Sequence, residues 1–236
     1  EYLKKADKTA ASGEDDTRKI VSDMLSAIEA GGEDKVREYA AKLDNYTGNI
    51  VVTPEEIAAA TAKVPQQVKD DIQFSYDRVR GFAEKQRAAL VDFEVELSPG
   101  LFAGQKQIPV ATAGCYVPGG RYSHVASAVM SVATAKAAGV DHVIACSPPK
   151  PGAGVNPAII YTANLCGADT ILALGGVQGI AAMAFGLFTG HAADILVGPG
   201  KRLVAEAKRM QFGRVGIDPV AGPTGIAGIG GQRHAA

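Results

Sequence analysis

The segment Thr170-Ile171-Leu172-Ala173-Leu174-Gly175-Gly176-Val177-Gln178 joins an apolar run to two glycines and then to an alanine-rich stretch. After Thr170 no polar residue interrupts the run, which is typical of a strand that is buried on both faces. The two glycines favour a tight turn. The residues from Val177 to Leu187 then predict a helix. One strand, one turn and one helix therefore follow each other directly.

The same unit recurs along the chain from residue 113. The expected strands are Ala113–Val117, His142–Cys146, Thr170–Leu174, Asp194–Val197 and Arg214–Ile217. The expected helices between them are Ser123–Ala138, Val155–Cys166, Val177–Leu187 and Lys201–Met210. Strands that alternate with helices at this spacing are typical of βαβ units. The predicted fold class is therefore α/β, with a Rossmann-like parallel sheet, helices on both of its faces, and a helical segment before it.

The region before residue 113 is expected to be mainly helical. Thr53-Pro54-Glu55-Glu56 is a strong helix start, because Thr53 and Glu56 have the spacing of a capping box. Apolar residues at helical spacing predict one helix that ends at Gly31-Gly32, a short second helix, and a long helix after Pro65. Their expected inward residues are Val21, Met24, Leu25 and Ile28; Val36, Tyr39, Ala40 and Leu43; and Val68, Ile72, Val79, Phe82 and Leu90. Phe93–Leu97 alternates as a strand does.

Composition excludes several classes of function. Hydrophobic residues make up 47% of the 236 residues, which is enough for a core, and the net charge of −1 gives no basic surplus for nucleic acid. Trp is absent and aromatics are 6%, which argues against a surface on which bases stack. The apolar runs are too short for a membrane span. The three cysteines have no metal-type spacing and are interpreted as thiols in a reducing cytoplasm, so we expect a cytoplasmic protein.

Glycine-bearing turns follow three of the expected strands. They are Pro118-Gly119-Gly120, Gly175-Gly176 and Gly198-Pro199-Gly200, and each leads into an expected helix. Because parallel strands end at the same edge, these turns place backbone N–H groups and helix N-termini together, where a diphosphate binds well. Each glycine can also serve the turn alone, and the usual G-x-G-x-x-G fingerprint is absent. The residues by themselves therefore predict a nucleotide or phosphate ligand and nothing narrower.

Longer motifs carry a resemblance to a known family. They are Cys115–Gly120, Gly175–Ala182, Val197–Gly200, Ala205–Arg209 and Ile217–Thr224, with Thr53–Ile57, Gly104-Gln105 and Pro109 before them. In this order and spacing they resemble the histidinol dehydrogenase family over nearly the whole chain up to Thr224. Within that family, Tyr122–Ala128 and Ala145–Pro149 are similar to the branch of sulfopropanediol 3-dehydrogenases. Members of the family oxidise a primary alcohol to a carboxylate in two NAD-dependent steps.

The resemblance implies roles for individual residues. Tyr116 and Gln178 stand at positions that contact NAD in the family, and Lys201 stands where the family has an asparagine that does so. A lysine beside a diphosphate is physically reasonable. Thr224 matches a hydroxyl position on the substrate side, and we interpret His124 or Arg121 as a partner for a sulfonate. For each of them the ordinary alternative is packing or solvation without a ligand.

The resemblance also implies zinc, whose ligands are not found in this chain. The four histidines have no Glu, Asp or Cys partner at metal-ligand spacing. After Thr224 the chain continues as a glycine-rich tail that departs from the family. We therefore expect a helical region at 1–112 that is part of an incomplete first α/β domain, a Rossmann-like NAD-binding domain at 113–224, and a divergent tail at 225–236. The chain is expected to lack the catalytic half.

The favoured function is zinc-assisted, NAD-dependent oxidation of a small primary alcohol, with 2,3-dihydroxypropane-1-sulfonate as the substrate. One alternative is the oxidation of histidinol in histidine biosynthesis. Another is a nucleotide-binding fragment without catalysis, because the chain by itself is expected to be inactive. The resemblance further implies a homodimer, with no nucleic acid or membrane as partner.

Overall fold

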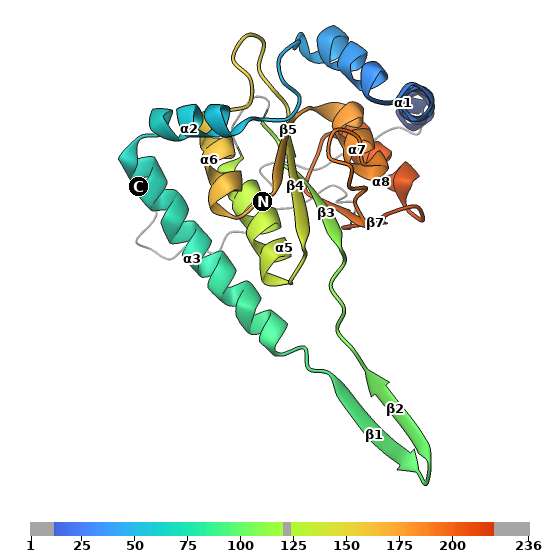
Figure 1. Cartoon of the computed structure of the whole chain (residues 1–236). Helices are drawn as coiled ribbons and strands as arrows, with labels where there is room; N and C mark the ends of the chain where they lie inside the picture. The colour runs from blue at the N-terminus through green and yellow to red at the C-terminus, as the bar shows by residue number, and fades with distance from the viewer. Residues whose placement is uncertain (1–11, 120–123, 220–236) are drawn as a thin grey trace, which may run out of the picture.

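A five-stranded parallel sheet organises the molecule, as Figure 1 shows. The computed structural model describes residues 12–119 and 124–219. The strands are β3 (Thr112–Tyr116), β4 (His142–Ser147), β5 (Thr170–Ala173), β6 (Ile195–Val197) and β7 (Gly216–Ile217). Their order is β5-β4-β3-β6-β7, so the chain builds outward from β3 and then crosses back to continue at β6. The predicted α/β class is confirmed, and the order reverses between β3 and β6.

Helices cover the two faces of the sheet. Alternate residues of β3 point to opposite sides: Cys115 packs in one apolar cluster and Tyr116 in the other. The Cys115 side carries α2 (Pro54–Lys63), α3 (Gln66–Ala88), α4 (Val125–Ala128), the π-helical turn η1 (Val129–Ala133), α5 (Thr134–Ala137) and α6 (Pro157–Leu165). The Tyr116 side carries α1 (Ser12–Asp44), α7 (Gly176–Phe185) and α8 (Arg202–Gln211).

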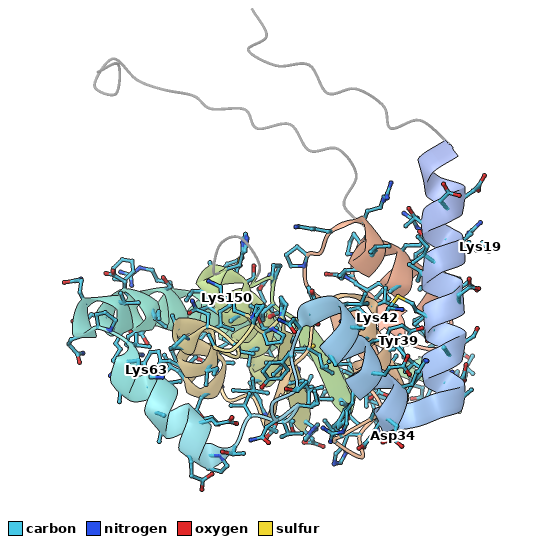
Figure 2. All side chains as sticks on the ribbon, turned by 90° about the horizontal axis from the view of Figure 1, so that it is seen from above. Lys19, Asp34, Tyr39, Lys42, Lys63 and Lys150 are labelled. Carbon is cyan, nitrogen blue, oxygen red and sulfur yellow. The ribbon has the colours of Figure 1, made fainter. Side chains whose placement is uncertain are left out.

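Helix α1 is bent at Gly32, where φ is +58°. Figure 2 shows the bend near Asp34, between the segment that carries Lys19 and the segment that carries Tyr39 and Lys42. A residue with a side chain rarely adopts such a φ, so the predicted end of the first helix at Gly31-Gly32 marks a real break. Both segments pack on the sheet through their predicted apolar residues, with the exception of Leu43, which is exposed.

The capping box that starts α2 is confirmed. The Thr53 hydroxyl accepts from the Glu56 amide at 3.3 Å, and the Glu56 carboxylate accepts from the Thr53 amide at 2.8 Å. The long helix α3 also forms, and its Ile72 is buried as expected. Phe82 and Leu90 are exposed, contrary to the prediction. Phe82 faces away from the core although the next residue, Ala83, is buried, and Leu90 follows the end of α3. From that end the chain leads away from the sheet toward a hairpin (Figure 1).

A hairpin projects from the sheet after α3 (Figure 1). Its first strand, β1 (Phe93–Ser98), includes the predicted Phe93–Leu97, and its second, β2 (Leu101–Gln105), is not predicted by the alternation. The two pair antiparallel, and every residue in both is exposed. Gly104 suits β2 because a Cβ there would lie 2.5 Å from the Phe93 carbonyl oxygen.

The segment around residue 51 attaches the N-terminal region to the sheet. The Val52 amide donates to the Ile171 carbonyl at 2.9 Å, and the Ala173 amide donates to the Ile50 carbonyl at 2.7 Å. The helix predicted at Ser123–Ala138 is instead a succession of α4, η1 and α5, and Ser123 itself lies outside the described residues. Among the described helices, none combines the length and the apolar character that a membrane crossing demands.

Candidate functional site

The predicted gathering of turns at one edge is borne out by the sheet. Strands β3, β5 and β6 are parallel, so the residues that follow them lie at the same carboxyl edge. Figure 2 looks toward this edge, where Lys150 follows the end of β4. The reversal of strand order falls between β3 and β6, and ligands of open α/β sheets bind outside the strand ends at such a reversal.

The ends of β3 and β6 meet through backbone atoms. Gly198 follows β6 with a φ of +113°, and a Cβ there would lie 2.1 Å from the Tyr116 carbonyl oxygen. Both the dihedral angle and the lack of space exclude any side chain at this position. This close approach draws the β6 turn against the end of β3.

Tyr116 also reaches the turn that follows β5. Its hydroxyl oxygen accepts a hydrogen bond from the Gly176 amide at 3.1 Å, at the first residue of α7. The side chain is buried, and burial raises the pKa of the hydroxyl well above its usual range. The hydroxyl therefore keeps its proton at neutral pH and retains an O–H that can donate.

Gln178 and Asp44 form a buried pair at the same turn. The Gln178 Nε2 donates to Asp44 Oδ2 at 2.8 Å, and the Gln178 side chain is 2% exposed. Burial raises the pKa of the Asp44 carboxyl, while hydrogen bonds from Gln178 and from the Gly175 amide act in the opposite direction. A carboxylate near a helix N-terminus is stabilised by the helix dipole. Asp44 therefore occupies, for α7, the place that an anionic ligand takes at other helix starts.

The N-terminus of α8 is different. Its N-cap residue is Lys201, which is exposed and makes no side-chain capping hydrogen bond within the described chain. Lys208 and Asp218 form an ion pair, and both make a hydrogen bond with Gly198 in the turn before this helix. A cavity of about 260 Å³ lies here, lined by Gly198, Pro199, Gly200, Ala205, Lys208, Asp218 and Pro219.

A larger, mainly apolar cavity of about 430 Å³ lies beside the same turn. It runs between β6 and the helical segment of α4, η1 and α5, and it includes Gly198, Pro199 and Asp218. Its volume is within the range of small-molecule sites. The two cavities together show that the β6 turn borders open space on two sides.

Ser147 ends β4 at this edge with a buried hydroxyl. Its Oγ has no hydrogen-bond partner among the described residues, and the side chain is 1% exposed. A Cβ on Gly119 would lie 2.7 Å from this oxygen, so the hydroxyl sits directly beneath the turn that follows β3. A buried hydroxyl without a partner is costly, which makes it a candidate ligand group.

The structure brings the predicted site residues together in part. Tyr116 and Gln178 meet around Gly176, and Lys201 lies in the β6 turn that touches Tyr116. His124 is exposed at the start of α4, and its amide donates to the Pro118 carbonyl at 3.2 Å. Thr224 and Arg121 lie outside the described residues.

His142 and His191, at the amino edge of the sheet, do not belong to a group of metal-binding side chains among the described residues. His142 and His191 stack with ring centroids 4.2 Å apart, and burial together with His191 lowers the pKa of His142. Within residues 12–119 and 124–219, no group of three or more His, Cys, Asp or Glu residues has the arrangement of a metal site. Zinc does not fit the described residues by themselves.

Sequence reasoning missed Asp44, Ser147 and the Lys208–Asp218 pair. Asp44 and Gln178 are 134 positions apart, so no local pattern joins them. Lys208 and Asp218 each fall within a motif quoted above, but the motif does not reveal that the lysine is buried. The available signal was a lysine and an aspartate of opposite charge in two successive motifs, ten positions apart.

Comparison with known proteins gives one family. The histidinol dehydrogenase family profile matches residues 7–234, and so continues ten positions beyond Thr224. The sulfopropanediol 3-dehydrogenase of Ruegeria pomeroyi is 62% identical over 224 residues, which is 95% of this chain and 52% of that protein. A histidinol dehydrogenase homolog of Pelagibacter ubique is 61% identical over 226 residues, 95% of this chain and 53% of that protein. The resemblance inferred from the motifs is confirmed.

A solved structure agrees with this match. The crystal structure of histidinol dehydrogenase from Elizabethkingia anophelis has a TM-score of 0.83 and 31% identity, and the match covers 94% of this chain and 50% of that one. The chain thus spans about half the length of the relatives it matches.

The contact between Gly198 and Tyr116 predicts an unequal response to two alanine substitutions. Gly213 has a similar φ of +101° but nothing within 4 Å of a Cβ. We expect Gly213→Ala to lower the free energy of unfolding by about 1–2 kcal/mol through backbone strain, and Gly198→Ala by about 3 kcal/mol or more through strain and overlap. Urea unfolding measures both variants. Equal losses would show that the β3–β6 contact does not constrain the turn.

Proposed function

The chain belongs to the histidinol dehydrogenase family, and from this premise we propose that it binds NAD at the carboxyl edge of its sheet. The observation that carries the proposal is the β6 turn. Gly198 is fixed at the reversal of strand order, cavities border it, and the N-terminus of α8 begins directly after it. Backbone amides at a helix start favour an anion such as the NAD diphosphate.

The two helix starts differ in their fitness for the diphosphate. At α7 the Gly176 amide bonds to Tyr116, and Asp44 supplies a negative charge beside Gly175. A diphosphate there would meet the Asp44 carboxylate, which has no ion-pair partner among the described residues. At α8 the Asp218 carboxylate is ion-paired with Lys208, and the exposed Lys201 adds a further positive charge. We therefore place the diphosphate at the turn Gly198–Lys201. The buried Ser147 hydroxyl is proposed as a further donor at the same edge.

Tyr116 and Gln178 are proposed as NAD ligands at the adjoining turn. In the structure both bury their polar groups against partners from the chain, the Gly176 amide and Asp44. Tyr116 keeps an O–H that can donate to NAD without losing its bond from Gly176, whereas the Gln178 Nε2–H that now bonds Asp44 would be exchanged for a bond to the cofactor. Lys201 needs no such exchange, because its side chain is exposed.

The reaction we propose is the NAD-dependent oxidation of a small primary alcohol to a carboxylate, with a sulfonated diol as the substrate. The specific support is the 62% identity with a sulfopropanediol 3-dehydrogenase, against 38% with the histidinol dehydrogenase of Methanosarcina barkeri. Two NAD molecules in succession would each accept one hydride, and water would supply the second oxygen of the carboxylate. Thr224, and His124 or Arg121, are proposed for the substrate side. Oxidation of histidinol is the second candidate.

Zinc is proposed only for an assembly that supplies ligands from beyond the described residues. In zinc enzymes of this kind the metal polarises the alcohol oxygen. Because the described residues offer no set of ligands, we expect the 236-residue chain alone to bind NAD without turnover. A homodimer is proposed from the family resemblance, and a cytoplasmic location from the three cysteines interpreted as thiols.

Calorimetric titration of the 236-residue chain with NAD tests the cofactor proposal. We expect saturable binding without metal, weakened about tenfold by Gln178→Met, which keeps the volume of the side chain and removes its hydrogen bonds. Gln211→Met is the matched control, because Gln211 is also buried but ends α8 at the opposite edge. No heat at millimolar NAD would contradict the proposal, as would equal effects of the two variants.

Salt dependence tests the role of Lys201. If its ammonium group attracts the diphosphate, Lys201→Ala should weaken NAD binding about threefold at low ionic strength. The effect should vanish near 1 M salt, where the Debye length is about 3 Å. Lys150→Ala removes another exposed lysine from the same edge and should change little. A loss that is the same at both salt concentrations would make Lys201 a bystander.

A chimera tests the substrate. We expect the Ruegeria enzyme to keep its preference for the sulfonated diol over histidinol when the matching half is replaced by this chain. In that chimera His124→Ala should raise KM for the diol about tenfold and leave kcat unchanged, because an imidazole N–H that holds the sulfonate acts already in the ground state. A preference for histidinol would favour the second candidate.

A further inference from the structure

We propose that Lys208 is a positioning residue for the NAD site, which fixes the turn Gly198–Lys201 through its ion pair with Asp218. The inference rests on the proposed function, since it names the side chain that shapes the turn where we place the diphosphate. Lys208 lies on the buried face of α8 and is only 4% exposed. A lysine is almost never buried to this extent unless its charge is paired.

The contacts form a closed ring around Gly198. The Lys208 Nζ donates to the Gly198 carbonyl at 2.8 Å and is ion-paired with Asp218 Oδ1. The other carboxylate oxygen, Oδ2, accepts from the Gly198 amide at 2.8 Å. Both polar groups of one backbone residue are thus held by one ion pair whose members come from α8 and from the residue after β7.

The glycine at position 198 gives the ring of contacts its function, because a glycine turn is flexible unless other groups hold it. A glycine has more backbone conformational freedom to lose than any other residue type, and the turn contains two glycines, Gly198 and Gly200. One hydrogen bond from Lys208 and one to Asp218 hold the turn in a single conformation without a ligand. Holding a site ready in this way lowers the entropic cost of binding.

The ion pair is proposed to affect NAD binding by fixing the conformation of the turn and not by adding net charge. Lys208 and Asp218 neutralise each other, so the pair contributes little attraction for a diphosphate. A buried ion pair also adds little stability compared with apolar residues of the same volume. These two facts separate Lys208 from Lys201, whose exposed charge is proposed to attract the cofactor.

Lys208→Met in the full 236-residue chain tests the inference. Methionine keeps the length of the side chain, and the Asp218 side chain, which is 30% exposed, can take up water in exchange. Lys136→Met is the matched control, because Lys136 also donates to a carbonyl, that of Asp141, and pairs with Asp169 at 2.6 Å, but at the amino edge of the sheet.

We expect Lys208→Met to weaken NAD binding about tenfold and to speed hydrogen exchange of the Gly198 amide. The loss of affinity should be the same at low and high salt, unlike that of Lys201→Ala. Lys208→Gln, which restores a hydrogen-bond donor without the charge, should recover part of the affinity. It also replaces Lys208→Met if the methionine variant does not fold.

Unchanged affinity in a folded Lys208 variant overturns the inference, and so does an equal loss in Lys136→Met. A loss of affinity that disappears at high salt also overturns it, because it would show that the lysine acts by charge. If the unaltered chain binds no NAD, the proposed function fails. Hydrogen exchange at Gly198 then decides whether Lys208 holds the turn: faster exchange supports the ring of contacts, and unchanged exchange overturns it.

Discussion

The contact between Gly198 and the Tyr116 carbonyl joins the two halves of the sheet at the point where strand order reverses. Everything at the carboxyl edge depends on this approach of one backbone to another. It requires a glycine with positive φ, it sets the start of α8, and it leaves Tyr116 oriented so that its hydroxyl reaches Gly176. A side chain at position 198 would separate β3 from β6.

The carboxyl edge is asymmetric because different charged groups lie at the N-termini of α7 and α8. Asp44, brought in by the N-terminal helix, satisfies the start of α7 and orders Gln178. At α8 the ion pair of Lys208 and Asp218 holds the turn and also lines the cavity beside it, and Lys201 at the helix start is exposed. A helix dipole that is already complemented attracts a further anion less than one that is not.

The sheet and its helices were predictable because each strand is an apolar run between glycine turns, and a parallel sheet follows from that alternation. Boundaries shifted by a few residues, as at Lys201, which caps α8. Phe82 and Leu90 were wrongly predicted to be buried, because helical spacing shows that apolar residues share a helix face but not that another element packs against that face. Of the site, the glycine turns and their common edge were readable from the sequence. The Asp44–Gln178 pair was not, because the two residues are 134 positions apart, and the burial of Lys208 was not, because a lysine on a helix is ordinarily exposed.

We propose that NAD binds at the carboxyl edge of the sheet, at the β3–β6 reversal. Amide chemical shifts of the ¹⁵N-labelled chain during titration with NAD test it directly. We expect saturable shifts at Gly176 and Gly198, and none at Gly139 and Gly167, which form positive-φ turns at the amino edge. Shifts confined to the amino edge, or no saturable shift at Gly198, would contradict it.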